Sequence, residues 1–222
     1  MDLIHALGTS LSGLNAAQAN LGIVAGNVAN SQTPGYIALS ASQIVTTSGD
    51  GSESVRISSI NRLLDGFVQA QLRTETAGGA YADIQAKFYQ QLQQVYGQPG
   101  TDASLDGVFN KFTAAAQSLA TSPSSVSVQA ATINAAQALV QQLNGATSSI
   151  QGLRTLADQA ISDDVQQVNN ALKQIADINQ HVAGTNANDS AAAALEDQRD
   201  QAIDTIAKLL DIRVSLGSDN QV

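Results

Sequence analysis

The first thirty residues repeat apolar side chains at intervals of three and four. Two series, each seven residues apart, interleave through four heptads. Their members are Ile4, Leu11, Gln18 and Ala25 in one series, and Leu7, Leu14, Leu21 and Val28 in the other. Such series are the a and d positions of a coiled coil, so they predict one long helix with an apolar seam. A seam of this kind has to be covered by another helix, which restricts the chain to folds built from lengthwise helix packing.

This helix is expected to be unstable in isolation. Gly8, Gly13, Gly22 and Gly26 lie inside it, and each glycine costs about 1 kcal/mol relative to alanine. Burial of the seam offsets that cost only when another surface covers it. We therefore expect the segment to be disordered in the isolated subunit and helical after assembly. The candidate assembly seam consists of Ile4, Leu7, Leu11, Leu14, Leu21 and Val28.

The heptad pattern stops in a ten-residue stretch, residues 27–36, which we call the motif turn. Local chemistry alone explains it as a helix end, because Asn30 can adopt a left-handed conformation and Thr33-Pro34-Gly35 is an ordinary turn sequence. The alternative is a turn with a role in assembly. The candidate residues for that role are Asn27, Asn30, Thr33, Pro34, Gly35 and Tyr36.

Composition excludes several classes of function. The net charge is −9, every lysine and arginine lies at Arg56 or later, and no basic patch is interleaved with aromatic residues, so we expect no nucleic-acid partner. The absence of cysteine excludes disulfides and thiolate metal sites. No apolar run approaches 18 residues, so no membrane insertion is expected. A cleaved signal is not recognisable either, which favours the cytoplasm unless export uses another route.

After the motif turn the pattern changes twice. Two β-rich stretches, 37–47 and 53–60, flank Asp50-Gly51, which predicts a hairpin. Helical spacing then resumes at Asn61 and runs to Val95, with Gly78-Gly79 as a weak point and residues 97–100 as its end. A short helix from Leu105 to Leu119 follows, and Ser122-Pro123 ends it.

The next stretch of helical spacing is the longest in the chain. It runs from Ala136 to Val182, with a break expected near Ser162, and predicts one helix or two nearly collinear ones reaching about 85 Å. Such a helix must lie along other helices. A polar loop at 184–189, a last helix around Leu195 to Leu209, and a strand starting at 212–216 complete the prediction.

The predicted fold is therefore mainly α, with long helices in a coiled-coil or bundle arrangement and a small β-hairpin near residues 37–60. We expect an N-terminal assembly segment at 1–60, an elongated helical domain at 61–211, and the start of a truncated β region at 212–222. The unpaired heptad and the interrupted hairpin at the tail indicate a piece of a longer protein.

A search for chemistry finds no candidate catalytic, cofactor-binding or metal-ligating residues. His5 and His181 lie in different elements without ligand-like neighbours at helical spacing. Asp163-Asp164 is better explained as acids near a helix start, where they favour the helix dipole, than as a cation site. The charged run Glu196 to Asp200 is interpreted as a solvated face with weak ion pairs.

Several segments resemble one family when they are taken in order. Ser12 to Gln18, Asn27-Val28-Ala29-Asn30 and Thr33-Pro34-Gly35-Tyr36 resemble the N-terminal motif shared by bacterial flagellar axial proteins. The later segments are similar to the FlgK family, that of flagellar hook-associated protein 1: Ile60 to Phe67, Gln71 to Arg73, Leu105 to Phe112, Leu119 to Pro123 and Asp197 to Asp200. The likeness covers almost the whole chain, although Ala193 to Glu196 departs from the pattern usual in the family.

The resemblance implies a structural subunit of the bacterial flagellum at the hook–filament junction, without enzymatic activity. It implies type III export without a cleaved signal, which accounts for a secreted protein lacking one. The implied partners are the protein's own missing C-terminal helix on the seam, identical subunits, hook protein, the second hook-associated junction protein and an export chaperone.

Two alternatives stay open at the level of sequence. One is another flagellar axial subunit, from the hook, the rod or the filament side of the junction. Hook and rod subunits should turn to β structure soon after the hairpin, whereas helical spacing here continues for roughly 150 residues. The other alternative is a secreted coiled-coil interaction module, which would not need an uncharged N-terminal helix.

Overall fold

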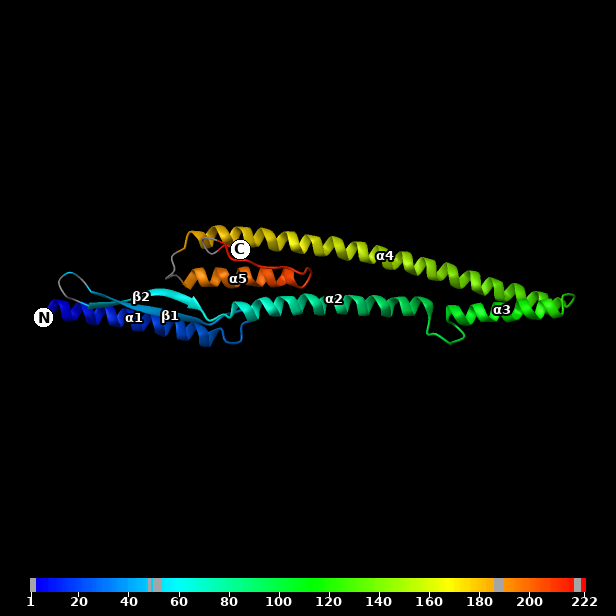
Figure 1. Cartoon of the computed structure of the whole chain (residues 1–222), viewed down its shortest axis with the longest axis horizontal. Coiled ribbons are helices and arrows are strands. Elements are labelled where there is room, and N and C mark those ends of the chain that lie inside the picture. Colours follow the sequence, from blue (N-terminus) through cyan, green and yellow to red (C-terminus); the bar gives the residue numbers. More distant parts are fainter. Residues whose placement is uncertain (1–2, 48, 50–52, 186–189, 218–220) are drawn as a thin grey trace. The chain divides into compact units, whose positions relative to one another are not determined.

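The computed structural model describes residues 3–47, 49, 53–185, 190–217 and 221–222, and within these ranges it consists of helices and one small sheet (Figure 1). The elements are α1 Leu3–Ala29, β1 Leu39–Thr47, β2 Glu53–Arg62, α2 Gly66–Tyr96, α3 Leu105–Thr121, α4 Val126–Ala183 and α5 Ser190–Ala207. The predicted mainly α fold with a small hairpin is confirmed. The chain forms two compact units, one of residues 1–78 and 166–222 and one of residues 79–165.

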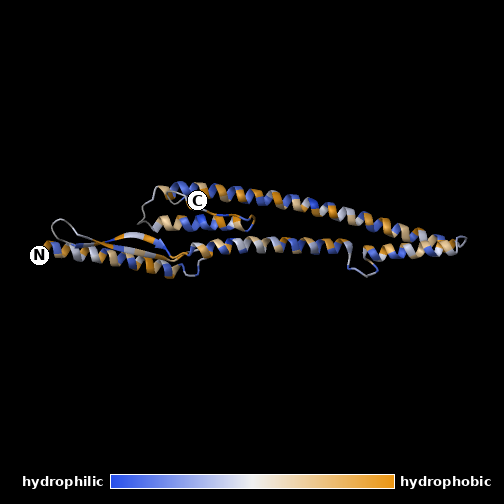
Figure 2. Ribbon diagram, viewed as in Figure 1, coloured by the Kyte–Doolittle hydropathy of each residue, from blue (hydrophilic) through white to orange (hydrophobic). Residues whose placement is uncertain are grey.

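In the first unit, α1 lies along the hairpin with its polar side. The Thr9 hydroxyl donates to the Glu53 carbonyl at 2.6 Å, and the Val55 amide donates to the Ser12 hydroxyl at 3.1 Å. Ala16, which shares this face, is the buried residue of the helix. Apolar residues recur along α1 (Figure 2), and the seam residues are more than half exposed, whereas Ala16 on the contacting face is buried. The hairpin therefore holds α1 by hydrogen bonds and small residues, which reverses the usual orientation of an amphipathic helix.

The two strands are antiparallel, with Leu39 opposite Arg62 and Thr47 opposite Glu53. The register shifts between Ser42 and Gln43, as at a β-bulge. The predicted Asp50-Gly51 turn lies outside the described residues. This register places Arg62 opposite Leu39, where the chain passes from the motif turn into β1. The position of the Arg62 side chain follows from this pairing.

The second long helix starts later than the spacing predicted. Asn61 and Arg62 belong to β2, and α2 begins at Gly66. The reason is local capping, because the Asp65 carboxylate accepts from the amides of Phe67 at 2.9 Å and Val68 at 3.2 Å. The helix runs unbroken through Gly78-Gly79 and ends at Tyr96, before the predicted stop at 97–100.

The core of the first unit is the packing of α5 on the last turns of α4. Small and β-branched residues from the two helices interlock there. They are Ala171 and Ile175 of α4 with Ala202, Ile203 and Ile206 of α5. The predicted break near Ser162 is wrong, since α4 is continuous from Val126 to Ala183. The three-four spacing through Val165, Val168 and Leu172 is not interrupted, so nothing forces a new start. Asp163-Asp164 consequently lies within the helix and not at its N-terminus.

The tail after α5 does not form the strand expected at 212–216. These residues are irregular, and Ile212 and Val222 pack against the α4–α5 core. The Asn179 side chain donates to the Val222 carbonyl at 2.9 Å. The side-chain carbonyl of Asn179 also accepts from the Val222 amide at 3.4 Å, so one asparagine of α4 holds this residue of the tail. The predicted polar loop and the predicted turn of the tail, at residues 186–189 and 218–220, lie outside the described residues.

The second unit contains the end of α2, α3 and most of α4. Ser104 caps α3, accepting from the Gly107 amide at 3.2 Å, as the helix pattern requires. The Thr132 hydroxyl of α4 donates to the Ala115 carbonyl of α3 at 3.1 Å, which joins the two helices. Pro123 lies in the short connection between them, where a proline ends helical structure.

We predict that α1 is the least protected helix of the first unit. Its buried residue is Ala16, whereas eight residues of α5 are buried. Local opening free energy follows buried packing, so amides of α1 should exchange at least ~100-fold faster than those of α5. Hydrogen–deuterium exchange of the isolated chain, read by peptide, measures this. Equal protection of Leu7–Val28 and α5 would refute it and, with it, the expectation that α1 orders fully on assembly.

Candidate assembly interface

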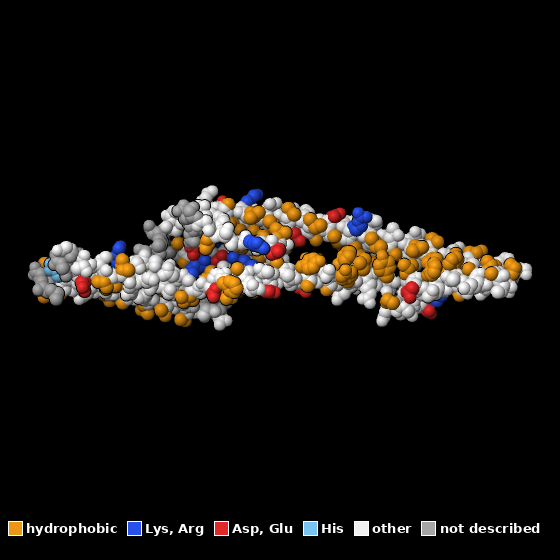
Figure 3. Space-filling model, viewed as in Figure 1, with side chains coloured by type: hydrophobic (Ala, Val, Ile, Leu, Met, Phe, Trp, Pro, Cys, Tyr) orange, Lys and Arg blue, Asp and Glu red, His pale blue; other side chains and the backbone are white. Residues whose placement is uncertain are grey.

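The apolar seam is exposed along the whole of α1. The seam residues with their exposed fractions are Ile4 77%, Leu7 71%, Leu11 56%, Leu14 63%, Leu21 69% and Val28 69%. Hydrophobic side chains are visible on the surface over this helix (Figure 3). Leu3 and Val24 are more than half exposed beside them. A continuous apolar row of this length is a typical interaction surface, since single exposed leucines are common but rows are not.

The motif turn is organised by Asn27. Its side-chain carbonyl accepts from the Tyr36 hydroxyl at 2.8 Å and from the Leu39 amide at 2.9 Å. Its side-chain amide donates to the Leu39 carbonyl at 2.9 Å. One asparagine therefore joins the end of α1, the tyrosine of the turn and the first residue of β1. The side chain faces the hairpin and is half-buried, so it is not part of the exposed surface.

The rest of the motif turn is held by hydrogen bonds of Asn30, Thr33 and Tyr36. The Asn30 amide and its side-chain Nδ2 both donate to the Gly26 carbonyl at 3.0 Å, and the Thr33 amide donates to the Asn30 carbonyl at 2.9 Å. The Tyr36 amide donates to the Thr33 carbonyl at 3.2 Å, which closes the turn over Pro34 and Gly35. Gly35 has φ +78°, the conformation that the third position of a type II turn requires.

The motif turn rests on α5, which no sequence pattern indicated. The Ile37 amide donates to the Asp197 carboxylate at 3.2 Å. A Cβ at Gly35 would lie 2.6 Å from the Gln201 side chain, so the backbone approaches α5 closely at this glycine. Between the turn and the helix is a cavity of about 240 Å³. Its lining includes Thr33, Tyr36, Asp197 and Gln201.

Next to this contact lies a group of largely buried charged side chains, of which Asp204 is 47% exposed, and we call it the arginine–carboxylate cluster. It consists of Arg62, Arg73, Glu196, Asp197, Asp200 and Asp204. Arg62, at the end of β2, reaches three acids of α5: Asp197 with Nε at 2.8 Å, Glu196 with Nη1 at 3.4 Å, and Asp200 with Nη2. The Arg62 side chain is 10% exposed. A guanidinium is suited to such a contact because its donors lie in a fixed plane.

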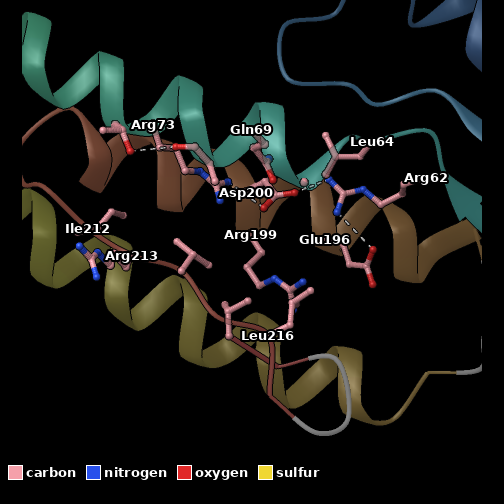
Figure 4. A pocket seen from close by; sticks show the side chains of 15 residues that line it. Arg62, Leu64, Gln69, Arg73, Glu196, Arg199, Asp200, Ile212, Arg213 and Leu216 are labelled. Carbon is pink, nitrogen blue, oxygen red and sulfur yellow. Dashed lines mark hydrogen bonds and ion pairs between the residues drawn. The ribbon is translucent and has the colours of Figure 1, made fainter.

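Arg73 joins α2 to the same helix (Figure 4). Its Nη2 lies 3.0 Å from Asp200, and its Nε lies 2.6 Å from Asp204. Asp200 is thus shared by two guanidinium groups. The interpretation of Glu196 to Asp200 as a solvated face is wrong, because Asp197, Arg199 and Asp200 are buried. Spacing along one helix did not reveal that two arginines from other elements cover these acids.

The pKa values show how burial and pairing compete in the cluster. Burial alone would raise the pKa of Asp200, but hydrogen bonds from Arg62 and Arg73 outweigh it and lower that pKa. At Asp197 burial prevails and raises the pKa, with the Ile37 amide and Arg62 offsetting only part of it. The pKa of Arg62 is raised, because the hydrogen bond and charge of Asp200 exceed the effect of its own burial.

A cavity of about 570 Å³ lies between the cluster and the C-terminal tail (Figure 4). Arg62, Arg73 and Asp200 contribute to one side of it, and Val214 and Leu216 to the other. Within the described part of the chain, no group of three or more His, Cys, Asp or Glu residues is arranged to hold a metal ion. Over the same residues, no helix is long and apolar enough to cross a membrane.

Some candidate residues come together and others do not. Asn27 and Tyr36 meet directly, and Asn30 and Thr33 are hydrogen-bonded at 3.3 Å between their side chains. The seam residues do not come together in a core, since each of them is more than half exposed. The residues that sequence reasoning missed are Arg62, Arg73 and the acids of α5. The signal for Arg62, Arg73, Asp197 and Asp200 was that they fall in segments that resemble a known family, whereas Glu196 and Asp204 lie outside those segments.

Comparison with known proteins gives first the class and then the family. Residues 7–36, which are α1 from its second turn and the motif turn, match the family model for the flagella basal body rod protein. This match indicates the class of flagellar structural proteins. Residues 89–222, more than half of the chain, match the model for the flagellar hook-associated protein FlgK helical domain. The chain belongs to the FlgK family.

Curated relatives agree with this assignment. The chain is 28% identical over 221 residues to flagellar hook-associated protein 1 of Bacillus subtilis (strain 168), covering 94% of this chain and 43% of the relative. It is 29% identical over 220 residues to the protein of the same name from Salmonella typhimurium, covering 93% and 38%. For Escherichia coli (strain K12) the identity is 27% over 221 residues, covering 95% and 39%. The chain therefore spans about two fifths of the length of these relatives.

We predict that Asn27→Ala detaches the start of β1 from α1. The substitution removes three hydrogen bonds and leaves the half-buried Leu39 backbone unpaired, at a cost of about 2 kcal/mol. Exchange of the Leu39 amide should then accelerate roughly 30-fold. Asn15→Ala, at an exposed position of the same helix, is the matched control and should leave this amide unchanged. Equal exchange in both variants would contradict the role of Asn27.

We further predict that Asp200→Asn and Asp197→Asn behave differently. Asp200→Asn removes the charge between two buried arginines and should destabilise the first unit by about 3 kcal/mol at pH 7. Asp197→Asn removes a carboxylate whose ionised form is disfavoured by burial and keeps an acceptor for the Ile37 amide, so its cost should be under about 1 kcal/mol. Protection of α5 amides in hydrogen exchange measures both.

The pH dependence separates the two acids further. Asp200, with a lowered pKa, contributes stability that is complete above its unfolded pKa of about 3.9 and is lost as the pH falls through its folded value. Asp197, with a raised pKa, works in the opposite direction, and its protonation stabilises the fold as the pH falls toward about 3.9. Asp200→Asn should abolish the acid loss and Asp197→Asn the acid gain. Identical pH profiles for the two variants would contradict this assignment.

Proposed function

We propose that this chain is the N-terminal portion of a structural subunit of the bacterial flagellum, which forms the hook–filament junction by helical self-assembly. The observation that carries the proposal is the exposed apolar seam of α1, in a chain of the FlgK family. A helix whose polar face is occupied by its own hairpin has only the apolar face left for a partner. The role is structural and needs no catalytic residue.

The proposed occupant of the seam is a C-terminal helix of the same protein, with identical subunits around the pair. The relatives named flagellar hook-associated protein 1 extend well beyond the part that this chain matches, so they contain sequence able to supply that helix. Between Leu3 and Gly49 the chain has no Asp, Glu, Lys or Arg, which suits a helix surrounded by other protein. An interface core excludes charge because desolvating it is costly.

Further partners follow from the proposed position. Hook protein would lie on one side of the junction and the second hook-associated protein on the other, and an export chaperone would bind the subunit before secretion. The route would be type III export to the flagellum without a cleaved signal. The motif turn and the domain boundaries at 60 and 211 belong to the same proposal, with the motif turn setting the end of the assembly helix.

Another flagellar axial subunit is the alternative that a specific observation favours. The rod-protein model matches residues 7–36, so this segment alone fits any axial subunit. The helical-domain match over residues 89–222 favours the junction protein over hook and rod subunits. A self-contained secreted coiled coil is less well supported, because deletion of residues 1–36 would then have to unfold the remaining helices, whereas the α4–α5 core lies outside that segment.

The seam is tested by Leu14→Glu in the full-length protein, expressed in a strain that lacks its own copy. Leu14 is 63% exposed, so the charge should leave the helical content of the secreted subunit unchanged. Burying the same charge in an assembled seam is costly, and incorporation into isolated hook–filament structures should fall at least ~100-fold. Quantitative immunoblotting of purified flagella measures incorporation, and swimming in soft agar reports its consequence.

The matched control is Leu156→Glu, at an exposed position of α4 where the leucine is 59% exposed. This variant should be secreted and incorporated as the unmodified protein is. Normal incorporation of Leu14→Glu would show that the seam stays exposed to solvent and would overturn the proposal. Equal loss with Leu156→Glu would also overturn it, because any exposed charge would then suffice.

A further inference from the structure

A line of direct contacts runs from the assembly segment to α5. Asn27 binds the first residue of β1, Leu39, through both of its polar side-chain atoms. Leu39 pairs in register with Arg62, at the last position of β2. Arg62 then contacts the acids of α5. The first step consists of hydrogen bonds, the second is a register pair within the sheet, and the third consists of ion pairs.

A second line of contact reaches the same carboxylate. The Ile37 amide, directly after the motif turn, donates to one oxygen of Asp197, at 3.2 Å. The other oxygen lies 2.8 Å from the Arg62 guanidinium. Asp197 thus joins the strand that enters the hairpin and the strand that leaves it. The two chain segments are held at one point on α5.

The burial of Arg62 and Asp197 indicates that their contact fixes the orientation of the elements more than it adds to the free energy of folding. The side chains of Arg62 and Asp197 are 10% and 9% exposed, and desolvating both ions costs much of what their attraction returns. Apolar residues of similar size would hold the elements together as well. They would not set a direction, because apolar packing is not directional. The hydrogen bond of Arg62 to Asp200 and that of the Ile37 amide to Asp197 do have preferred angles.

We infer that Arg62 and Asp197 are positioning residues, which fix the direction of the hairpin, and of α1 bound along it, relative to α5. The seam would then be presented at one defined angle from the helical part of the first unit. Arg73 and Asp204 have a different task, because they connect α5 to α2 and do not touch the motif turn or the hairpin. The consequence for assembly rests on the proposed function, but the geometry itself does not.

The geometry is tested on the chain alone, by the distance between spin labels. The sequence has no cysteine, so Thr47→Cys on β1 and Thr205→Cys on α5, both exposed, give one label on each side of the junction. Double electron–electron resonance should show one narrow distance distribution in this parent. Asp197→Ala should lose the narrow peak and give a broad distribution, while α5 amides remain protected in hydrogen exchange. The hairpin label makes the result independent of whether α1 is ordered.

Two further variants distinguish a positioning role of Asp197 from a general loss of rigidity around α5. Asp204→Ala removes the acid of α5 that pairs with Arg73 and not with Arg62, and it should keep the narrow peak. Asp197→Asn keeps an acceptor for the Ile37 amide and should restore most of the peak that Asp197→Ala loses. A narrow peak in Asp197→Ala would overturn the inference. Equal broadening by Asp204→Ala would overturn it as well, since loss of any ion pair on α5 would then have the same effect.

The assembly consequence has its own readout. In the full-length protein, Asp197→Ala should reduce incorporation into flagella, and Asp197→Asn should recover it. If the distance distribution broadens but incorporation does not change, the positioning role stands and its use in assembly fails. If Leu14→Glu assembles normally, the proposed function fails while the distance measurement is unaffected.

Discussion

The carboxylate of Asp200, shared by Arg62 and Arg73, is the interaction on which the first unit depends. It joins the end of β2 and the start of α2, which follow one another in the chain, to the middle of α5, more than 120 residues later. Removing one member would leave the others charged and without water, so the cluster is stable only as a whole. The hydrophobic core of α4 and α5 lies beside it and supplies most of the burial.

On this base the chain separates two kinds of surface. The polar side of α1 is satisfied by hydrogen bonds to its own hairpin, and its apolar side is left exposed. Folding of the chain therefore leaves the apolar side of α1 exposed, although this surface has a large hydrophobic driving force for burial. This order suits the proposed function, in which the strongest packing would form only between neighbouring subunits after export.

Sequence reasoning identified elements better than contacts. Heptad spacing located α1, and three-four spacing located α2, α3, α4 and α5, because these periods follow from helix geometry alone. It misplaced the start of α2, which Asp65 decides by capping, and it predicted a break in α4 and a strand at 212–216 that do not form. The charged run of α5 was assigned to solvent, because its partners Arg62 and Arg73 are more than 120 residues away.

The amino-acid sequence by itself determined the helices, the motif turn, the uncharged N-terminal segment and the seam, since each depends on residues within a few turns of one another. Only the tertiary structure decided which face of α1 is covered, that the motif turn rests on Asp197, and that the acids of α5 are buried. The physical reason is that pairing and burial depend on which distant segments meet, and the spacing of residues along the chain does not encode which segments those are.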